Sequence, residues 1–168
     1  MDRKESLLRI IREAAVRLES LSGGRHDIAS KAENDFVTAC DREIEEFIRN
    51  EIHSEFPQDG ILGEEYGSEV SHDSYLWIVD PIDGTVNFMN TYPQYTISIA
   101  LKKGEDIIAG AVFNPPFGEL FHAFRSEGAF LNGKRIKAED DLPLNRTLAL
   151  VVPPHRRHEY LEDFWTQE

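Results

Sequence analysis

Two aspartates, Asp80 and Asp83, stand three residues apart directly after a short apolar run, in a segment that extends from Trp77 to Phe88. Gly84 and Thr85 follow them at once. Hard cations prefer oxygen ligands, and a phosphate group binds to cations and to free backbone N–H groups. This segment can supply all of these within a few residues. It therefore indicates chemistry on a phosphate ester that is held through bound Mg²⁺.

The two carboxylates are expected to lie near one point. Pro81 fixes its own φ and favours an extended conformation for Asp80, so the chain turns sharply between the two aspartates. The main-chain carbonyl of Ile82 would face the same way and could be a third oxygen ligand. The alternative is an ordinary Asp-Gly turn in which Asp80 acts as a cap. The apolar strand before the pair and the Gly-Thr after it favour the metal.

Gly84 and Thr85 could begin a short helix with Asn87 and Phe88 in its first turn. The free N–H groups of such a turn would point at an anion, and the Thr85 hydroxyl could bond to a metal-bound water. The alternative is simple capping of this helix by Thr85 or Asp83.

Three other carboxylates could join the site. Glu64 and Glu65 follow a second short strand, and strand alternation lets only one of them point inward. Two solvated glutamates at a strand end are the alternative. Asp41 is expected in the first turn of a helix, where a carboxylate interacts favourably with the helix dipole. On its own it would be interpreted as an ordinary first-turn carboxylate without a role in the site.

The elements that must position these residues can be read from hydrophobic spacing. Apolar residues at spacings of three and four predict a helix from about residue 4 to residue 21, and a second from about residue 41 to residue 55 that Pro57 ends. Short apolar runs predict strands at 61–63 and 76–79, with a polar loop at 66–74 between them. From residue 95 the period is two, which predicts antiparallel strands at 96–101, 107–113, 119–124 and 129–131, and Asn132-Gly133 is a strong hairpin turn.

This meander needs helices on one face, so the expected fold class is α+β, with two N-terminal helices before a mainly antiparallel sheet. Residues 147–152 are expected to form a buried strand and 155–168 a helix. That helix carries large apolar residues with no element after it. We expect a single phosphatase-like domain over 1–168 whose C-terminal layer is incomplete.

Composition narrows the function further. The chain has 168 residues, 18 basic and 31 acidic, and a net charge of −13, which disfavours nucleic acid and acidic membranes as partners. No apolar stretch reaches the length of a membrane span. A single cysteine, Cys40, excludes an internal disulfide and favours the cytoplasm. His155 and His158 lack further zinc ligands, and no glycine-rich nucleotide loop is present.

Residues 80–88, Asp-Pro-Ile-Asp-Gly-Thr-Val-Asn-Phe after Trp77, resemble the signature of the inositol monophosphatase family. Three further segments are similar to family elements and occur in the family's order: Val37-Thr38-Ala39-Cys40-Asp41, Gly63-Glu64-Glu65 and Gly128-Ala129-Phe130-Leu131-Asn132-Gly133. Ile82 and Asn87 favour this branch over the related phosphatases of adenosine bisphosphates and of fructose bisphosphate.

The resemblance implies the fold of that family, a layered α/β sandwich, and a set of metal ligands. Glu64, Asp80 and the Ile82 carbonyl would hold one Mg²⁺, and Asp80 and Asp83 would hold a second.

It also implies roles around the reacting water and the phosphate. Glu64 and Thr85 would position and activate the water, with Asp41 orienting Thr85. The Gly84 and Thr85 N–H groups would receive the phosphate oxygens, beside Asp83. The implied reaction is Mg²⁺-dependent hydrolysis of a small polyol or sugar phosphate, with inositol monophosphate favoured, usually by a homodimer.

Alternatives remain open at this stage. One is activity on fructose 1,6-bisphosphate or on 3′-phosphoadenosine 5′-phosphate. Another is a catalytically silent interaction module. The family has a later Trp-Asp-x-Ala element that completes the second metal site, and no segment of this sequence matches it. We therefore expect weak binding of the second metal and little activity from this chain alone.

Overall fold

The structure is a computed structural model that describes residues 2–22, 30–69 and 74–138 of the chain. By its internal contacts the chain divides into one unit of Met1–Lys137 and a second of Ala138–Glu168. The first unit contains every helix and strand described below. The strand expected at 147–152 and the helix expected at 155–168 lie outside the described residues.

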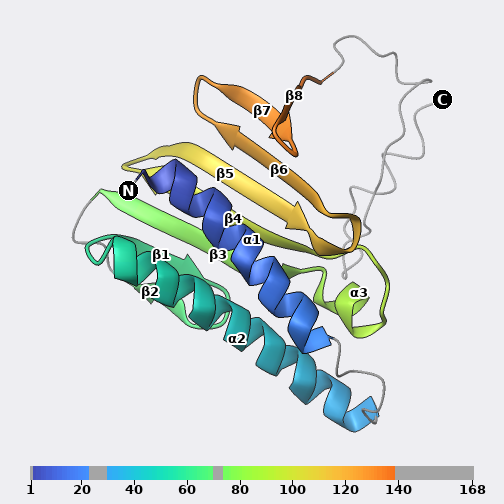
Figure 1. Cartoon of the computed structure of the whole chain (residues 1–168). Helices are drawn as coiled ribbons and strands as arrows, with labels where there is room; N and C mark the ends of the chain where they lie inside the picture. The colour runs from blue at the N-terminus through green and yellow to red at the C-terminus, as the bar shows by residue number, and fades with distance from the viewer. Residues whose placement is uncertain (1, 23–29, 70–73, 139–168) are drawn as a thin grey trace, which may run out of the picture. The chain divides into compact units, whose positions relative to one another are not determined.

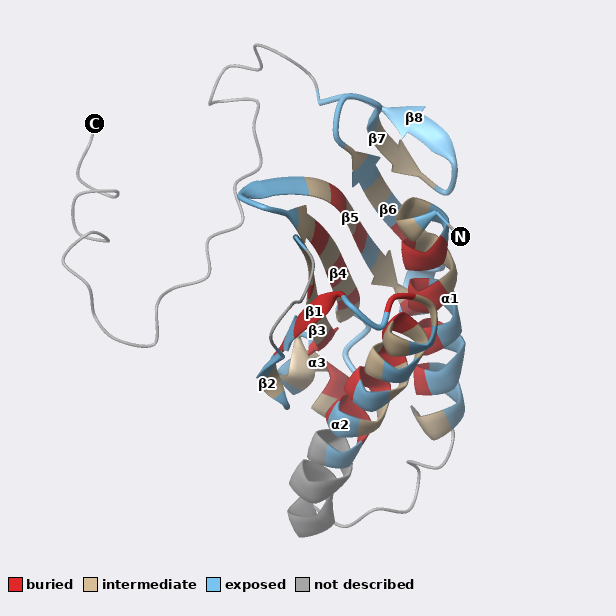
Figure 2. Cartoon of the chain, turned by 90° about the vertical axis from the view of Figure 1, so that its left-hand side faces the viewer, coloured by how far each residue is buried: buried red, intermediate tan, exposed pale blue. Residues whose placement is uncertain are grey.

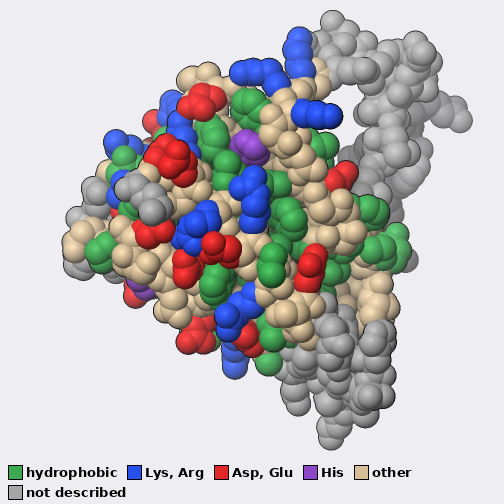
Figure 3. Space-filling view, viewed as in Figure 1, with side chains coloured by type: hydrophobic (Ala, Val, Ile, Leu, Met, Phe, Trp, Pro, Cys, Tyr) green, Lys and Arg blue, Asp and Glu red, His purple; other side chains and the backbone are tan. Residues whose placement is uncertain are grey.

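Two long helices open the first unit, α1 (Arg3–Ser22) and α2 (Ser30–Glu55). The boundaries expected for α1 are confirmed, because its apolar residues at helical spacing form one fully buried stripe: Leu7, Ile10, Ile11, Ala14 and Leu18. On the outward side of the helix pair, acidic and basic side chains interleave (Figure 3). Arg9, for example, pairs with Glu51 at 2.8 Å and with Glu55 at 2.7 Å, which ties α1 to α2.

The expected start of α2 at residue 41 was wrong, since the helix begins at Ser30. The helical pattern in fact begins earlier, because Ala32, Phe36 and Cys40 precede Ile44 at spacings of four, and residues 30–40 contain neither glycine nor proline to prevent helix formation. Asp41 therefore lies in the helix interior and not in its first turn.

The described strands form one eight-stranded sheet in the order β2-β1-β3-β4-β5-β6-β7-β8 (Figure 1). β1 and β3 are parallel, and every other neighbouring pair is antiparallel. The strands are β1 (Gly60–Gly63), β2 (Gly67–Glu69), β3 (Tyr75–Asp83), β4 (Thr96–Lys103), β5 (Asp106–Asn114), β6 (Glu119–Phe124), β7 (Gly128–Leu131) and β8 (Lys134–Ile136).

The predicted meander is confirmed from β4 to β7, within two residues at each end. The turn after β7 is the expected hairpin, with positive φ at both Asn132 and Gly133, and it leads into β8. Two features differ from expectation. The segment 66–74 was expected to be a loop, yet it holds β2, and β3 continues through Pro81 to Asp83.

Both long helices pack on the same face of the sheet, and the core lies between them and the strands (Figure 2). Trp77, Ile99 and Leu101 line the sheet side of this core with at most 2% exposure. Cys40 is buried among them, as a structural thiol would be. The opposite face of the sheet carries partly exposed apolar residues: Leu62 at 39%, Val112 and Phe121 at 38%, and Ile136 at 39%.

Among the described helices, we find none whose length and apolar content would let it traverse a lipid bilayer.

Candidate metal centre

The candidate centre lies where the two parallel strands end. The parallel pairing ends at Gly63 and Val79, so the next residues, Glu64 after β1 and Asp80 still within β3, follow it side by side. In a mixed sheet of this kind, the carboxyl ends of parallel strands are where side chains from different segments meet. The topology therefore brings together two carboxylates that are sixteen residues apart in the sequence.

A β-bulge adds Asp83 to this group. Asp80 is in register with Ser98 of β4 and Asp83 with Thr96, so β3 has one more residue than β4 between the two pairings. Because Ser98 and Thr96 share a face of the sheet, the extra residue returns Asp83 to the face of Asp80. The Thr96 hydroxyl donates to Asp83 Oδ2 at a long 3.5 Å. Pro81 lies within the irregular stretch, where a missing N–H is tolerated.

The chain turns after Asp83 at Gly84, whose φ of 92° and ψ of 37° place it in the left-handed region that glycine adopts readily. The expected short helix follows as α3 (Thr85–Met89), and no side chain caps it. The capping alternative for Asp83 and Thr85 is therefore wrong. The Thr85 hydroxyl instead donates to the Ile82 carbonyl at 2.9 Å. Among the described residues, it makes no hydrogen bond with Asp41.

Asp41 reaches the same region from α2 with only 6% of its surface exposed. Burial raises the pKa of its carboxyl group to about 7, and the charges of Glu65 and Glu64 add to this rise. Burial likewise raises the pKa of Asp80 to about 6, with contributions from Glu64 and Asp83, while a hydrogen bond from the Ile82 backbone N–H opposes it. Carboxylates that raise one another's pKa lie within electrostatic reach of each other.

One atom of this group is unusual. The Oδ1 atom of Asp80 is buried and has no hydrogen-bond partner. A buried acceptor without a partner is costly, so such an atom commonly marks the place of a water or an ion. The donor set is oxygen only and rich in negative charge, which fits a hard divalent cation. In the described ranges, no three acidic, histidine or cysteine side chains converge on one point as they stand.

The two glutamates after β1 have different surroundings. Glu64 is exposed, and its charge is the second largest cause of the raised pKa of Asp80. Glu65 is partly buried and pairs with Arg42 at 3.3 Å. The structure thus places Glu64, and not Glu65, beside Asp80, while its role as a metal ligand stays a prediction.

The sequence analysis missed Glu45, a fully buried carboxylate of α2 that contacts the segment after β1. A signal was present. Asp41, Glu45, Ile48 and Ile52 follow one another at spacings of four and three, which places two acidic residues within the apolar stripe of the helix.

The sequence model of the inositol monophosphatase family matches residues 5–166. A fructose-1,6-bisphosphatase/inositol-1-monophosphatase of Aquifex aeolicus is 43% identical over 132 residues, which cover 79% of this chain and 50% of that protein. An inositol-1-monophosphatase of Rhizobium meliloti is 38% identical over 130 residues, covering 76% of this chain and 48% of that one.

The fold has solved counterparts as well. The crystal structure of inositol monophosphatase II from Staphylococcus aureus superposes with a TM-score of 0.72 at 32% identity, over 82% of this chain and 50% of that one. The chain therefore spans about half the length of the relatives that it matches.

Proposed function

The chain belongs to the inositol monophosphatase family, and from that premise we propose that it hydrolyses a small polyol or sugar phosphate monoester with Mg²⁺, inositol monophosphate being the favoured substrate. The observation that carries the proposal is the buried Oδ1 of Asp80, which lacks a hydrogen-bond partner beside other carboxylates at the ends of β1 and β3. A divalent cation would satisfy this atom and relieve the repulsion around it.

The proposed ligands are Glu64, Asp80 and the Ile82 carbonyl for one Mg²⁺, and Asp80 and Asp83 for a second. When bound, the metal would supply a water of lowered pKa and positive charge beside the phosphoryl oxygens. Asp80 has the central position in this proposal, because Glu64 flanks it across the parallel ladder and the bulge returns Asp83 to its face.

Thr85 is proposed to orient the attacking water. Its hydroxyl has one proton, which is donated to the Ile82 carbonyl at 2.9 Å. If Asp41 is to orient this hydroxyl, the proton must turn from Ile82 to Asp41, since one hydroxyl cannot donate to both. Such a turn would leave the Thr85 oxygen as an acceptor for the water and release the Ile82 carbonyl for the cation. The phosphate is proposed to lie against the Gly84 and Thr85 N–H groups, beside Asp83.

Fructose 1,6-bisphosphate is the second candidate substrate. The observation that favours it is the Aquifex aeolicus relative, whose name includes both activities. Both substrates present a phosphate monoester on a polyhydroxylated ring or chain, so the proposed metal site would serve either.

Calorimetric titration of the full 168-residue chain with Mg²⁺ tests the proposal first, because it does not require turnover. We expect binding in the wild-type chain and a loss of at least about ten-fold in affinity in Asp80→Asn and Asp83→Asn. The matched control is Asp106→Asn. Asp106 is an exposed aspartate that pairs with Arg125, at the first residue of β5 and away from the proposed site. Equal Mg²⁺ binding by the wild type and Asp80→Asn would refute the site.

Phosphate release then separates the substrates and the silent module. The assay compares inositol 1-phosphate with fructose 1,6-bisphosphate, each with Mg²⁺ and with a chelator. Release that needs Mg²⁺ and falls at least about 100-fold in Asp83→Asn supports the proposed hydrolysis. Binding of Mg²⁺ without any release favours an interaction module that kept the metal site.

A further inference from the structure

Glu45 has no part in the site proposed above, yet its carboxylate is fully buried and makes three hydrogen bonds. Oε2 accepts from the backbone N–H of Glu65 at 2.7 Å. Oε1 accepts from Arg49 Nε at 2.8 Å and from the backbone N–H of Tyr66 at 3.3 Å. A helix side chain therefore holds the two residues that directly follow Glu64.

Arg49, one helical turn further along α2, holds the far side of the same turn. Its Nη2 donates to the Gly67 carbonyl at 2.6 Å, and its Nη1 donates to Glu69 Oε2 at 3.1 Å. The Arg49 side chain is only 11% exposed. Glu45 and Arg49 thus hold the turn between β1 and β2 by hydrogen bonds at its start and at its end. We call these two side chains the α2 clamp.

Gly63 makes room for the α2 clamp. A Cβ added to Gly63 would overlap the carboxyl group of Glu45, whose atoms occupy the space that any larger residue would need. The glycine before Glu64 is therefore explained by close packing against Glu45, and not by an unusual φ. Gly110 of β5 is a useful contrast, because a Cβ there would meet nothing within 4 Å.

Stability of the fold alone does not explain why α2 buries this charged pair. Burying an ion pair costs desolvation energy that its mutual attraction only partly returns, and apolar residues of similar size are often at least as stabilising. The cost is greater here, because Asp41, a second buried carboxylate, stands one helical turn before Glu45 on α2. Like charges at this spacing repel each other, which favours a role in function over a purely structural one.

We propose that Glu45, with Arg49, is a positioning residue for the metal centre: the α2 clamp fixes the turn after β1 so that Glu64 stands beside Asp80. Glu45 is assigned a positioning role and not a ligand role, because its three hydrogen bonds hold the carboxylate against Arg49 and the turn after β1. This inference rests on the proposed function, since it assigns Glu64 to the metal.

Gly63→Ala tests the clamp without changing any charge, and Gly110→Ala is its matched control on the same sheet. Glu45→Gln removes the charge at constant size, and Glu46→Gln, at an exposed neighbouring position, controls for that change. Mg²⁺ affinity is measured by calorimetry, at a temperature where circular dichroism shows each variant folded. Backbone amide exchange at Glu65 and Tyr66 is followed by NMR in the absence of metal.

We expect Gly63→Ala and Glu45→Gln to weaken Mg²⁺ binding about 10- to 100-fold, the range found for groups that support metal ligands. Exchange at the Glu65 and Tyr66 amides should quicken in the same variants and not in the controls. A merely structural clamp would lower the melting temperature but leave the affinity of the folded protein unchanged, and that result would overturn the inference.

Failure of the proposed function gives a different result. If the wild-type chain binds no Mg²⁺, the metal site is wrong and the inference that Glu45 positions its ligand falls with it. Faster amide exchange in Gly63→Ala would still identify a hydrogen-bonded turn, but a structural one. If the wild type binds Mg²⁺ and exchange at Glu65 is unchanged in Glu45→Gln, only the clamp is refuted.

Discussion

At the scale of single residues, the centre is defined by carboxylates in places where a carboxylate is unfavourable. Asp41 is buried inside α2, and Asp80 holds a buried oxygen without a partner. Both have raised pKa values, first through burial and then through neighbouring negative charges. Such residues lower the stability of the folded chain, and sites of this kind are typical of function.

The raised pKa values predict how stability depends on pH. Asp41 and Asp80 have pKa values of about 7 and about 6 in the folded chain, against an ordinary value of 3.8 for an aspartate carboxyl group. Between these values the folded state binds more protons than the unfolded state, so stability falls as pH rises. We expect the free energy of unfolding of the metal-free chain to decrease by about 1 to 3 kcal/mol from pH 5 to pH 7.5. Urea titrations with a chelator present measure this change.

Asp41→Asn identifies the residue responsible. The variant lacks the carboxyl group whose pKa is about 7, so its stability should vary less between pH 5 and pH 7.5 and should exceed that of the wild type at pH 7.5. Asp106→Asn, at an exposed ion pair, should keep the wild-type slope. An unchanged slope in Asp41→Asn would show that Asp41 is ionised in the folded chain already at pH 5.

The sequence could reveal some of these residues and not others. Asp80, Asp83 and Glu64 could be singled out because each follows an apolar strand, and strand ends are where a sheet presents side chains to solvent. The surroundings of Asp41 could not be predicted, since the start of α2 was misplaced and its depth in the core comes from tertiary packing. Glu45 was missed because a buried acid in an apolar stripe is recognisable only when its partners are known.

At the scale of elements, the bulge in β3 shows why alternation alone could not place Asp83. Strict alternation assigns residues three apart to opposite faces of a strand. One extra residue in β3 reverses this assignment, and Pro81 was the only local sign of irregularity. The strands β4 and β5 were predictable because buried and more exposed residues alternate along most of their length. β2 was not, since its three residues are polar or partly exposed.

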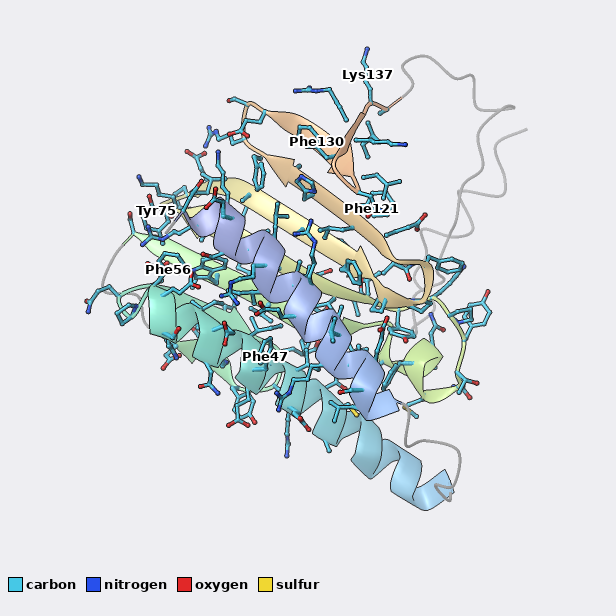
Figure 4. The ribbon with its side chains drawn as sticks, viewed as in Figure 1. Phe47, Phe56, Tyr75, Phe121, Phe130 and Lys137 are labelled. Atoms are coloured by element: carbon cyan, nitrogen blue, oxygen red, sulfur yellow. The ribbon has the colours of Figure 1, made fainter. Side chains whose placement is uncertain are left out.

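A second connection between elements joins the start of α1 to β1 and β3 through Asp59. Its carboxylate accepts two hydrogen bonds from Arg3 and one from Trp77 Nε1, all at 2.8 Å. The Arg3 guanidinium in turn lies over the rings of Tyr75 and Phe56, at 3.8 and 4.7 Å from their centroids, and Figure 4 shows these two rings at the same end of the sheet. One buried acid thus links three segments: the start of α1, the residues before β1, and β3.

Replacing Asp59 should be strongly destabilising. Asp59→Ala leaves the buried Trp77 N–H without this acceptor and removes the ion pair between Arg3 and the fully buried Asp59, and breaking such a pair costs about 3 to 5 kcal/mol. Urea unfolding followed by circular dichroism measures the loss. Asp106→Ala breaks an exposed pair and should cost no more than about 1 kcal/mol. Equal losses in the two variants would contradict the importance of burial.

At the scale of the whole molecule, the described unit is a sheet with both long helices on one face (Figure 2). The other face carries partly exposed apolar residues. A cavity of about 450 Å³ lies on that second face and is lined by Ile78, Asp80, Ala100, Val112, Phe121 and Ala123. The layered fold was predictable from the two helices and the meander, because an antiparallel sheet needs cover on at least one face.

The apolar residues of this face predict self-association, in keeping with the expected homodimer. Exposed apolar patches favour association of two copies, so sedimentation velocity should show a larger species whose share rises with concentration. Phe121→Ser should lower that share, since Phe121 is 38% exposed on this face. Val16→Ser, at a 67% exposed position on α1, is the control and should not. A chain that stays monomeric at every concentration would rule out this role for the face.

Because the chain has a net charge of −13, a test of Mg²⁺ binding must separate specific binding from general screening of that charge. Any salt will screen repulsion among 31 acidic side chains and raise stability, so an effect of Mg²⁺ alone proves nothing. A bound ion stabilises in addition by mass action, by about 2.7 kcal/mol at a concentration 100 times its dissociation constant.

At ionic strength matched with NaCl, we expect Mg²⁺ to raise the melting temperature of the wild type and not of Asp80→Asn. The increment should be larger at pH 7.5 than at pH 5.5, because protons compete with Mg²⁺ for the proposed ligand Asp80, whose pKa is raised to about 6, at the lower pH. Equal increments with Mg²⁺ and NaCl would mean that the acidic field, and not a metal centre, governs the response.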